Sequence, residues 1–301
     1  MDNKPIEKPR KPLLATTLSL AAPGLGQIYC GRFARGMVFF FCSFAFGPLL
    51  VATASHAPST TALMAAIASI FLVLVLFVYA AVDAYLLARK TAPDYRLKEY
   101  NKWYIYAFFI AFSIFYPVSL TSVIKQEVIQ AYKIPSNNMA PNIVRGDYVL
   151  LNKITYKQQQ PKKGDIIVFS YPNDRRLDYI KRIVAMPGDT IEIRDNIVSI
   201  NGTPLSDAAN RSPGASPDDG TILTETNGGI AYAIRVADQG PGRDYPKTIV
   251  PPGHCFVLGD NRAHSHDSRE FGPIPLADVK GRVEYIYYPA GDWKRFGRIA
   301  R

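Results

Sequence analysis

Three long apolar segments in the first half of the chain constrain its fold more than any other feature. They cover residues 36–54, 62–88 and 104–123, and residues 62–82 contain no charged side chain. A helix crosses the bilayer core with roughly 20 apolar residues, and buried helices of a soluble core explain an uncharged run of this length poorly. We therefore expect three transmembrane helices within a membrane domain of residues 1–124.

The charges of the loops predict how these helices are oriented. The segments "CGRFARG" before the first span and "RKTAPDYRLKEYNKW" after the second are basic, whereas "SHAPSTT" between them has no Lys or Arg. Because basic loops stay in the cytoplasm, we expect a multi-pass protein of the cytoplasmic (inner) membrane with residues 125–301 on the external, periplasmic side. The net charge of +10 favours membrane lipid as a partner. Nucleic acid is not expected, because no nucleic-acid-binding motif is present.

The segment at 13–30, "LLATTLSLAAPGLGQIYC", has basic residues on both sides and a Pro-Gly centre. If it crossed the membrane, the N-terminus would be external, against the charge rule. We expect a re-entrant or interfacial segment, and no cleavable signal peptide. Asp83 is the one clear ionisable residue near a span. It raises a transporter or channel component as a weaker alternative, although an interfacial position explains it more simply.

Residues 125–301 have the pattern of a β-rich domain. Gly-Asp pairs precede apolar or alternating runs in "GDYVLL", "GDIIVF" and "GDTIEI", and "HCFVLGDNR" and "VEYIYY" predict further strands. Short strands with frequent turns indicate a sandwich or a partly closed barrel. The stretch at 206–229 is rich in Ser, Pro, Asp and Gly and is expected to be a surface excursion. Cys255 on an apolar strand is expected to be a small core residue.

Four stretches after the apolar half resemble the type I signal peptidases, the membrane-bound Ser-Lys endopeptidases that remove signal peptides. They are "IPSNNMAPNIVRGD" (134–147), "GDIIVF" (164–169), "DYIKRIVAMPGD" (178–189) and "LGDNRAHSHDSREFGPIP" (258–275). The resemblance covers about 125–290. It implies a mainly antiparallel β catalytic-type domain that cuts the signal peptides of secreted pre-proteins, without cofactor or metal.

The resemblance also assigns roles to residues of this chain. Lys181 matches the family's general base, and burial would favour the neutral amine that a base must have. Adjacent Lys181 and Arg182 point to opposite faces of a strand, so we expect one inward and one solvated. Ser265 matches the residue that orients the lysine, and Asp267 and Arg269 match a supporting acid-base pair.

The loop at 134–147 matches the nucleophile loop but lacks the nucleophile. Ser136 matches a serine that helps to bind the oxyanion, but Asn138 stands where the family has its nucleophilic serine, directly before Met139. Asn142 likewise replaces a threonine. We expect Pro135 and Met139 to contact substrate, with core packing an equal alternative for Met139.

Three hypotheses follow from Asn138. Ser136 could act as a displaced nucleophile, which requires a shift of roughly 6 to 7 Å along an extended chain. Alternatively, the protein is a catalytically impaired pseudopeptidase that binds signal peptides or exported chains without cleaving them. Thirdly, another residue could activate water: His264 and His266 flank Ser265, and with Asp260 or Asp267 they suggest a His-Asp or metal arrangement, although exposed loop histidines are the more ordinary reading.

Overall fold

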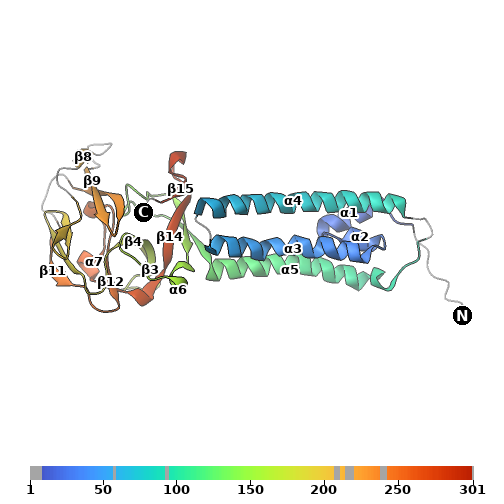
Figure 1. The fold of residues 1–301 in the computed structure, drawn as a ribbon, viewed down its shortest axis with the longest axis horizontal. Coiled ribbons are helices and arrows are strands. Elements are labelled where there is room, and N and C mark those ends of the chain that lie inside the picture. Colours follow the sequence, from blue (N-terminus) through green and yellow to red (C-terminus); the bar gives the residue numbers. More distant parts are fainter. Residues whose placement is uncertain are drawn as a thin grey trace. The chain divides into compact units, whose positions relative to one another are not determined.

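The structure, a computed structural model, describes residues 9–56, 59–91, 95–206, 211–213, 220–237 and 243–299. The chain divides into two compact units, Met1–Gln126 and Glu127–Arg301, helical and β-rich respectively (Figure 1). The predicted fold class, N-terminal apolar helices followed by a mainly antiparallel β domain, is confirmed.

The first unit contains five described α-helices. They are α1 (Pro12–Ala21), α2 (Leu25–Tyr29), α3 (Phe33–His56), α4 (Ser59–Lys90) and α5 (Trp103–Glu127). By length and composition, Ala68–Lys90 of α4 and all of α5 could each cross a membrane. The expected span at 36–54 falls on α3. There the described apolar stretch, Phe33–Ala45, is shorter than a span, and side chains 48–54 lie outside the described residues.

The segment expected to be re-entrant or interfacial forms two short helices, α1 and α2, of 10 and 5 residues. At 1.5 Å per residue these are about 15 and 8 Å long, so neither crosses a bilayer alone. Gly24 begins α2 with a φ of 94°, and a Cβ atom there would lie 2.0 Å from the Gly36 carbonyl oxygen of α3. A glycine is therefore required for this close approach.

Three polar side chains of the helical unit, those of Ser19, Gln27 and Asp83, are linked by hydrogen bonds. The Gln27 carboxamide donates to the Ala80 carbonyl at 2.8 Å and to Asp83 at 3.0 Å, and it accepts from Ser19 at 3.0 Å. Asp83 also forms an ion pair with Arg35. These bonds give the carboxylate of Asp83 a structural role, so its presence in α4 does not call for transport chemistry.

The second unit is built from strands that pair antiparallel. The largest sheet has the order β1-β2-β14-β3-β4-β12-β13, with β15 paired to β14, and the smaller sheets have the orders β10-β9-β8 and β11-β5-β6-β7. The strands are β1 (Ile129–Lys133), β2 (Tyr148–Asn152), β3 (Ile166–Ser170), β4 (Asp178–Ala185), β5 (Thr190–Arg194), β6 (Ile197–Ile200), β7 (Thr203–Pro204), β8 (Arg211–Pro213), β9 (Thr221–Asn227), β10 (Ile230–Val236), β11 (Tyr245–Ile249), β12 (His254–Leu258), β13 (Ile274–Pro275), β14 (Val279–Tyr288) and β15 (Gly297–Arg298). The short helices are α6 (Thr155–Gln158) and α7 (Ser268–Phe271).

One turn motif starts β2, β3 and β5. In each case a glycine with φ near +90° is followed by an aspartate whose carboxylate accepts the backbone N–H three residues earlier. The aspartates are Asp147, Asp165 and Asp189, and the three bonds are 2.8, 3.0 and 2.8 Å long. The Gly-Asp pairs therefore set where these strands begin, because only glycine adopts that backbone conformation without strain.

The main sheet curls so that two of its free edges lie close together. β1 pairs only with β2, and residues 178–181 of β4 pair with β3 but not with β12. The Tyr132 hydroxyl of β1 donates to the Asp178 carboxylate of β4 at 2.8 Å, although four strand-to-strand steps separate them in the sheet. A gap between two unpaired strand edges results.

The expected surface excursion at 206–229 is wrong for its C-terminal part. Residues 221–227 form β9, in which Leu223, Glu225 and Asn227 are buried. The polar composition predicted a surface loop, but Glu225 is buried because Arg262 neutralises it through bonds from both terminal nitrogens. Residues 207–210 and 214–219 lie outside the described part of the chain.

Candidate active site

A cleft of about 360 Å³ lies between β1, the loop that follows it and β4. Its lining residues are Tyr132, Lys133, Ile134, Pro135, Ser136, Asn138, Met139, Asp178, Tyr179, Ile180 and Lys181. The two unpaired strand edges thus form its walls. Five sequence-predicted site residues, Pro135, Ser136, Asn138, Met139 and Lys181, are brought together here.

The loop at 134–147 is held at both ends by backbone bonds. The Ile134 N–H donates to the Asp147 carbonyl at 2.8 Å, and the Gly146 N–H donates to the Ile134 carbonyl at 2.9 Å. Met139 is 2% exposed and packs in the core with Ile143, so it anchors the loop while also bordering the cleft. The core reading of Met139 and the substrate-contact reading are therefore compatible.

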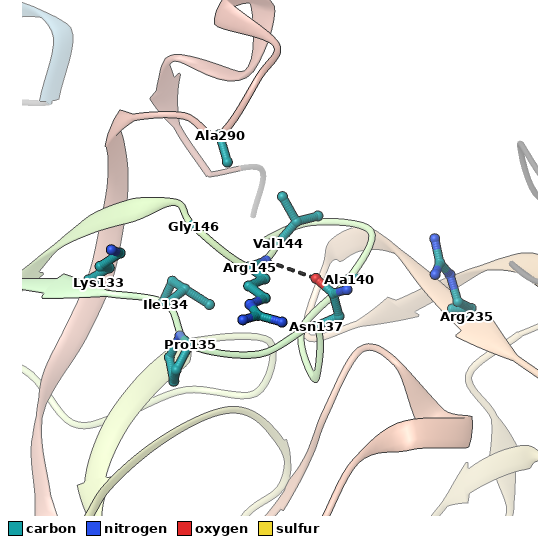
Figure 2. A pocket seen from close by; sticks show the side chains of 10 residues that line it. All are labelled: Lys133, Ile134, Pro135, Asn137, Ala140, Val144, Arg145, Gly146, Arg235 and Ala290. Atoms are coloured by element: carbon teal, nitrogen blue, oxygen red, sulfur yellow. Dashed lines mark hydrogen bonds between the residues drawn. The ribbon is translucent and has the colours of Figure 1, made fainter.

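Side chains along this loop alternate between two cavities. Ser136 and Asn138 line the cleft, whereas Asn137 lines a second cavity of about 870 Å³. Figure 2 shows Asn137 beside Arg145 in that second cavity, where its Oδ1 accepts the Arg145 N–H at 2.8 Å. This bond directs Asn137 away from the cleft and leaves Ser136 and Asn138 at it.

The backbone of Asn138 is fixed against the turn after β12. Its carbonyl accepts the Asn261 N–H at 3.1 Å, and the Asn261 carboxamide donates to the Asn137 carbonyl at 3.2 Å. A Cβ on Gly259 would lie 2.6 Å from the backbone carbonyl oxygen of Asn138 and 2.1 Å from the Ser265 Oγ. Gly259 therefore allows Asn138 and Ser265 to approach the same point.

Lys181 lies in β4 opposite Ile167 of β3 and is 2% exposed. Burial lowers the pKa of its ammonium group from 10.5 to about 8, with Asp267 and Asp260 opposing the shift. The Nζ atom lies 5.8 Å from the Tyr179 ring centroid. Burial of an amine beside a cleft disfavours its charged form and brings its ionisation close to neutral pH.

Ser265, Asp267 and Arg269 lie behind the cleft. The Asp267 carboxylate accepts two side-chain bonds from Arg269 at 2.8 and 2.9 Å and the Gly259 N–H at 3.0 Å. Burial raises the pKa of Asp267, but these bonds and the Arg269 charge outweigh it, so the net pKa is lowered. The Ser265 hydroxyl is near enough to Asp267 to contribute to that lowering, yet it makes no hydrogen bond of good geometry to a described residue.

Arg182 contradicts the expectation that one of the two neighbouring cations would be solvated. It is 1% exposed, its guanidinium donates to both oxygens of Asp260 at 2.8 and 2.7 Å, and it donates to the Gly164 carbonyl at 2.8 Å. Its guanidinium carbon also lies 4.0 Å from the centroid of the Tyr232 ring. Alternation along the strand predicts that Lys181 and Arg182 face opposite sides. It does not predict that Arg182 has a buried carboxylate partner on its own side.

Asn142 completes this buried cluster. Its carboxamide nitrogen donates to the Asp260 carboxylate and to the Ala233 carbonyl of β10, both at 2.7 Å. The Asn142 side chain thus ties the loop at 134–147 to the turn after β12 and to β10. The sequence alone does not indicate that Arg182 and Asp260 form a pair, because they are 78 residues apart.

Within the described part of the chain, neither His264 nor His266 is paired with Asp260 or Asp267. His266 is 2.6 Å from Glu270 and 3.0 Å from the Tyr171 hydroxyl, while Arg182 and Arg269 engage Asp260 and Asp267. In the described part of the chain, no group of three or more His, Cys, Asp or Glu side chains is arranged to hold a metal ion. Cys255 is fully buried, and burial raises the pKa of its thiol to about 12.

The second unit is thus an antiparallel β domain that follows apolar helices and holds a buried lysine at a cleft lined by strand edges. Residues 103–288 match the family described as "Signal peptidase, peptidase S26". The chain belongs to this family of serine peptidases.

Curated relatives agree with this assignment. The chain is 32% identical over 203 residues to signal peptidase I of Aquifex aeolicus (strain VF5), covering 55% of this chain and 78% of the relative. It is 33% identical over 202 residues to signal peptidase I of Pseudomonas fluorescens, with 58% and 70% covered. For signal peptidase I of Bacillus caldolyticus the identity is 31% over 180 residues, with 58% and 88% covered.

Proposed function

We propose that this protein is a signal peptidase I-type membrane protein that recognises the signal peptides of exported pre-proteins in the cleft but does not cleave them by the family's mechanism. The β domain would act at the external face of the cytoplasmic membrane, where it receives peptides from the bilayer. The observation that carries the proposal is that Asn138 lines the same cleft as Lys181. The sequence resemblance places Asn138 at the position of the family's nucleophile.

Recognition is supported by the unpaired strand edges. An extended peptide can add to a sheet edge through main-chain hydrogen bonds, with pockets reading alternate side chains. The cleft offers such an edge on β1 and another on residues 178–181 of β4. In the family's reaction the scissile bond follows small residues near the end of the signal peptide.

The proposed loss of cleavage follows from the chemistry of a carboxamide. Asn138 has no hydroxyl from which Lys181 could remove a proton, so the acyl-enzyme of the family mechanism cannot form there. Removing the nucleophile of a serine protease lowers turnover on the order of 10⁶-fold, leaving only weak catalysis from oxyanion binding. The family position of Asn138 thus predicts binding without appreciable turnover.

The roles of the other residues are carried over as part of the same proposal. Lys181 would be the general base position, Ser265 would orient its amine, and Ser136 would donate to a bound carbonyl oxygen. Asp267 and Arg269 would support Ser265 from behind, consistent with their buried ion pair.

A second candidate function keeps the peptidase activity and uses Ser136 as the nucleophile. One observation favours it: Ser136 lines the same cleft as Lys181. The backbone would have to shift, because two residues along an extended chain span roughly 6 to 7 Å. In that case the wild-type chain would cleave pre-proteins and the Ser136→Ala variant would not.

Binding is tested with the full chain in detergent micelles and a fluorescent pre-protein that carries its signal peptide. We expect saturable binding that a matched pre-protein with charges placed in its apolar signal segment does not show. No binding of either pre-protein would overturn the proposal. Steady release of a shorter mature protein by the wild-type chain would favour the second candidate.

A further inference from the structure

We propose that the preferred occupant of the cleft is a peptide that ends there, with its free α-carboxylate beside Lys181, as in a signal peptide that has already been cut. This inference rests on the proposed function and specifies the chemical class of its ligand. An intact pre-protein would instead place the neutral carbonyl of a peptide bond beside Lys181.

The charges around the cleft leave Lys181 as an uncompensated cation. Asp260 and Asp267 face it, but Arg182 neutralises the first and Arg269 the second. Within the described part of the chain, no carboxylate lies within the 4.0 Å of an ion pair with Lys181. The buried ammonium group therefore favours an anion as its partner.

The remaining acidic groups near the cleft are paired as well, whereas Lys133, the other lysine of its lining, is exposed. Glu270, which also acts on Lys181, contacts Arg243 at 2.9 Å and His266 at 2.6 Å. Asp178 of the cleft wall forms an ion pair with Lys280 at 2.6 Å. None of these acids is available to Lys181 without loss of its present partner, so an acid would have to come with the ligand.

Asn138 changes what the lysine can do. With a pKa of about 8, Lys181 is mostly protonated at neutral pH. In the family mechanism the neutral amine is the reactive form, but Asn138 gives it no hydroxyl to deprotonate. The charged form, in contrast, can bind a carboxylate, and the Asn138 carboxamide and Ser136 hydroxyl at the same cleft supply neutral donors for its oxygens.

The expected preference can be estimated from the bond between two charged groups. Hydrogen bonds to charged groups are worth enough to change affinity about 10- to 100-fold. An amide-terminated peptide of the same sequence would lack this contribution while keeping every main-chain contact to β1 and β4. The preference requires the lysine cation, so it should decrease as the pH rises through about 8.

The experiment compares three fluorescent forms of one signal peptide, bound to the full chain in detergent micelles. One form ends in a free acid, one in a carboxamide, and one continues into the mature sequence. We expect the free acid to bind about 10- to 100-fold more tightly than the other two at pH 6.5, with the difference reduced to about 2-fold at pH 9.5. Lys181→Met should remove the preference at every pH.

Lys157→Met is the matched control, because Lys157 is an exposed lysine of the same domain that pairs with exposed Glu127. It should keep the wild-type preference. Equal binding of acid and carboxamide forms by the wild-type chain would overturn this inference while leaving the proposed function intact. Persistence of the preference in Lys181→Met would also overturn it, because another cation would then be responsible.

Failure of all three peptides to bind would instead overturn the proposed function itself. If Lys181→Met does not fold, the wild-type pH profile decides the matter. A preference that is unchanged between pH 6.5 and pH 9.5 would contradict a role for Lys181, whose pKa of about 8 lies within that interval.

Discussion

Replacing Lys181 by methionine is expected to stabilise the folded β domain at neutral pH. Lys181 is 2% exposed, and burial lowers its pKa from 10.5 to about 8. The difference between these pKa values corresponds to about 3 kcal/mol of destabilisation when the lysine is protonated in both states. Methionine has a similar length and no charge, so Lys181→Met should recover up to about 3 kcal/mol at pH 7.

The free energy of unfolding should also depend on pH. Between pH 8 and 10.5 the unfolded chain holds the lysine proton and the folded chain does not, so unfolding takes up a proton. The stability of the wild-type chain should therefore rise with pH across this interval, relative to Lys181→Met. About 2 kcal/mol of the advantage of the variant should be lost between pH 7 and pH 9.5.

Pulse proteolysis of the full chain in detergent and increasing urea measures the folded fraction of the β domain. Lys157→Met, at an exposed ion pair, serves as the control and should change stability by less than about 1 kcal/mol at either pH. The reasoning is refuted if Lys181→Met destabilises the domain at pH 7, or if its effect is the same at pH 7 and pH 9.5.

Two further substitutions test the packing behind the cleft. Asp260→Asn should destabilise the β domain by about 3 to 5 kcal/mol in the same assay, because it leaves a buried guanidinium without its carboxylate, whereas Asp174→Asn at an exposed pair should have little effect. Equal effects of the two would contradict the buried pair. Gly259→Ala should weaken signal-peptide binding as well as stability, because the Cβ of the alanine would lie 2.1 Å from the Ser265 hydroxyl oxygen and 2.6 Å from the backbone carbonyl oxygen of Asn138. Unchanged binding and stability would show that these groups do not meet at Gly259.

Local features of the fold could be predicted because each is set by residues close together in the chain. The Gly-Asp pairs before β2, β3 and β5 combine a glycine with positive φ and an aspartate that bonds three residues back, so the signal is local. The uncharged run at 62–82 likewise predicts a long apolar helix from composition alone, and it lies within α4.

Features that depend on distant partners could not be predicted in the same way. Alternation along β4 indicates that Lys181 and Arg182 face opposite sides, but burial of Arg182 requires Asp260, 78 residues away. Glu225 occurs in a polar stretch that looks solvated, and only its ion pair with Arg262 allows it to be buried. The partners in these pairs become visible only when the sheets are assembled.

The candidate cleft combines features that could be predicted from the sequence with features that could not. The motifs brought Ser136, Asn138 and Lys181 forward as candidate site residues, and the structure places them around one cavity. The resemblance also drew attention to Asn142, for which it implies a threonine. Its two bonds, to Asp260 and to the Ala233 carbonyl, depend on the approach of β10 and the turn after β12.

Cleavage of a purified pre-protein by the full chain, read by mass spectrometry of the products, shows whether Asn138 prevents turnover. Wild type and Asn138→Ser are compared under the same conditions. The proposed function predicts no appreciable product from wild type and cleavage at the signal-peptide junction by Asn138→Ser, with the rate rising as Lys181 loses its proton near pH 8. Cleavage by wild type at a rate comparable to that of Asn138→Ser would contradict it.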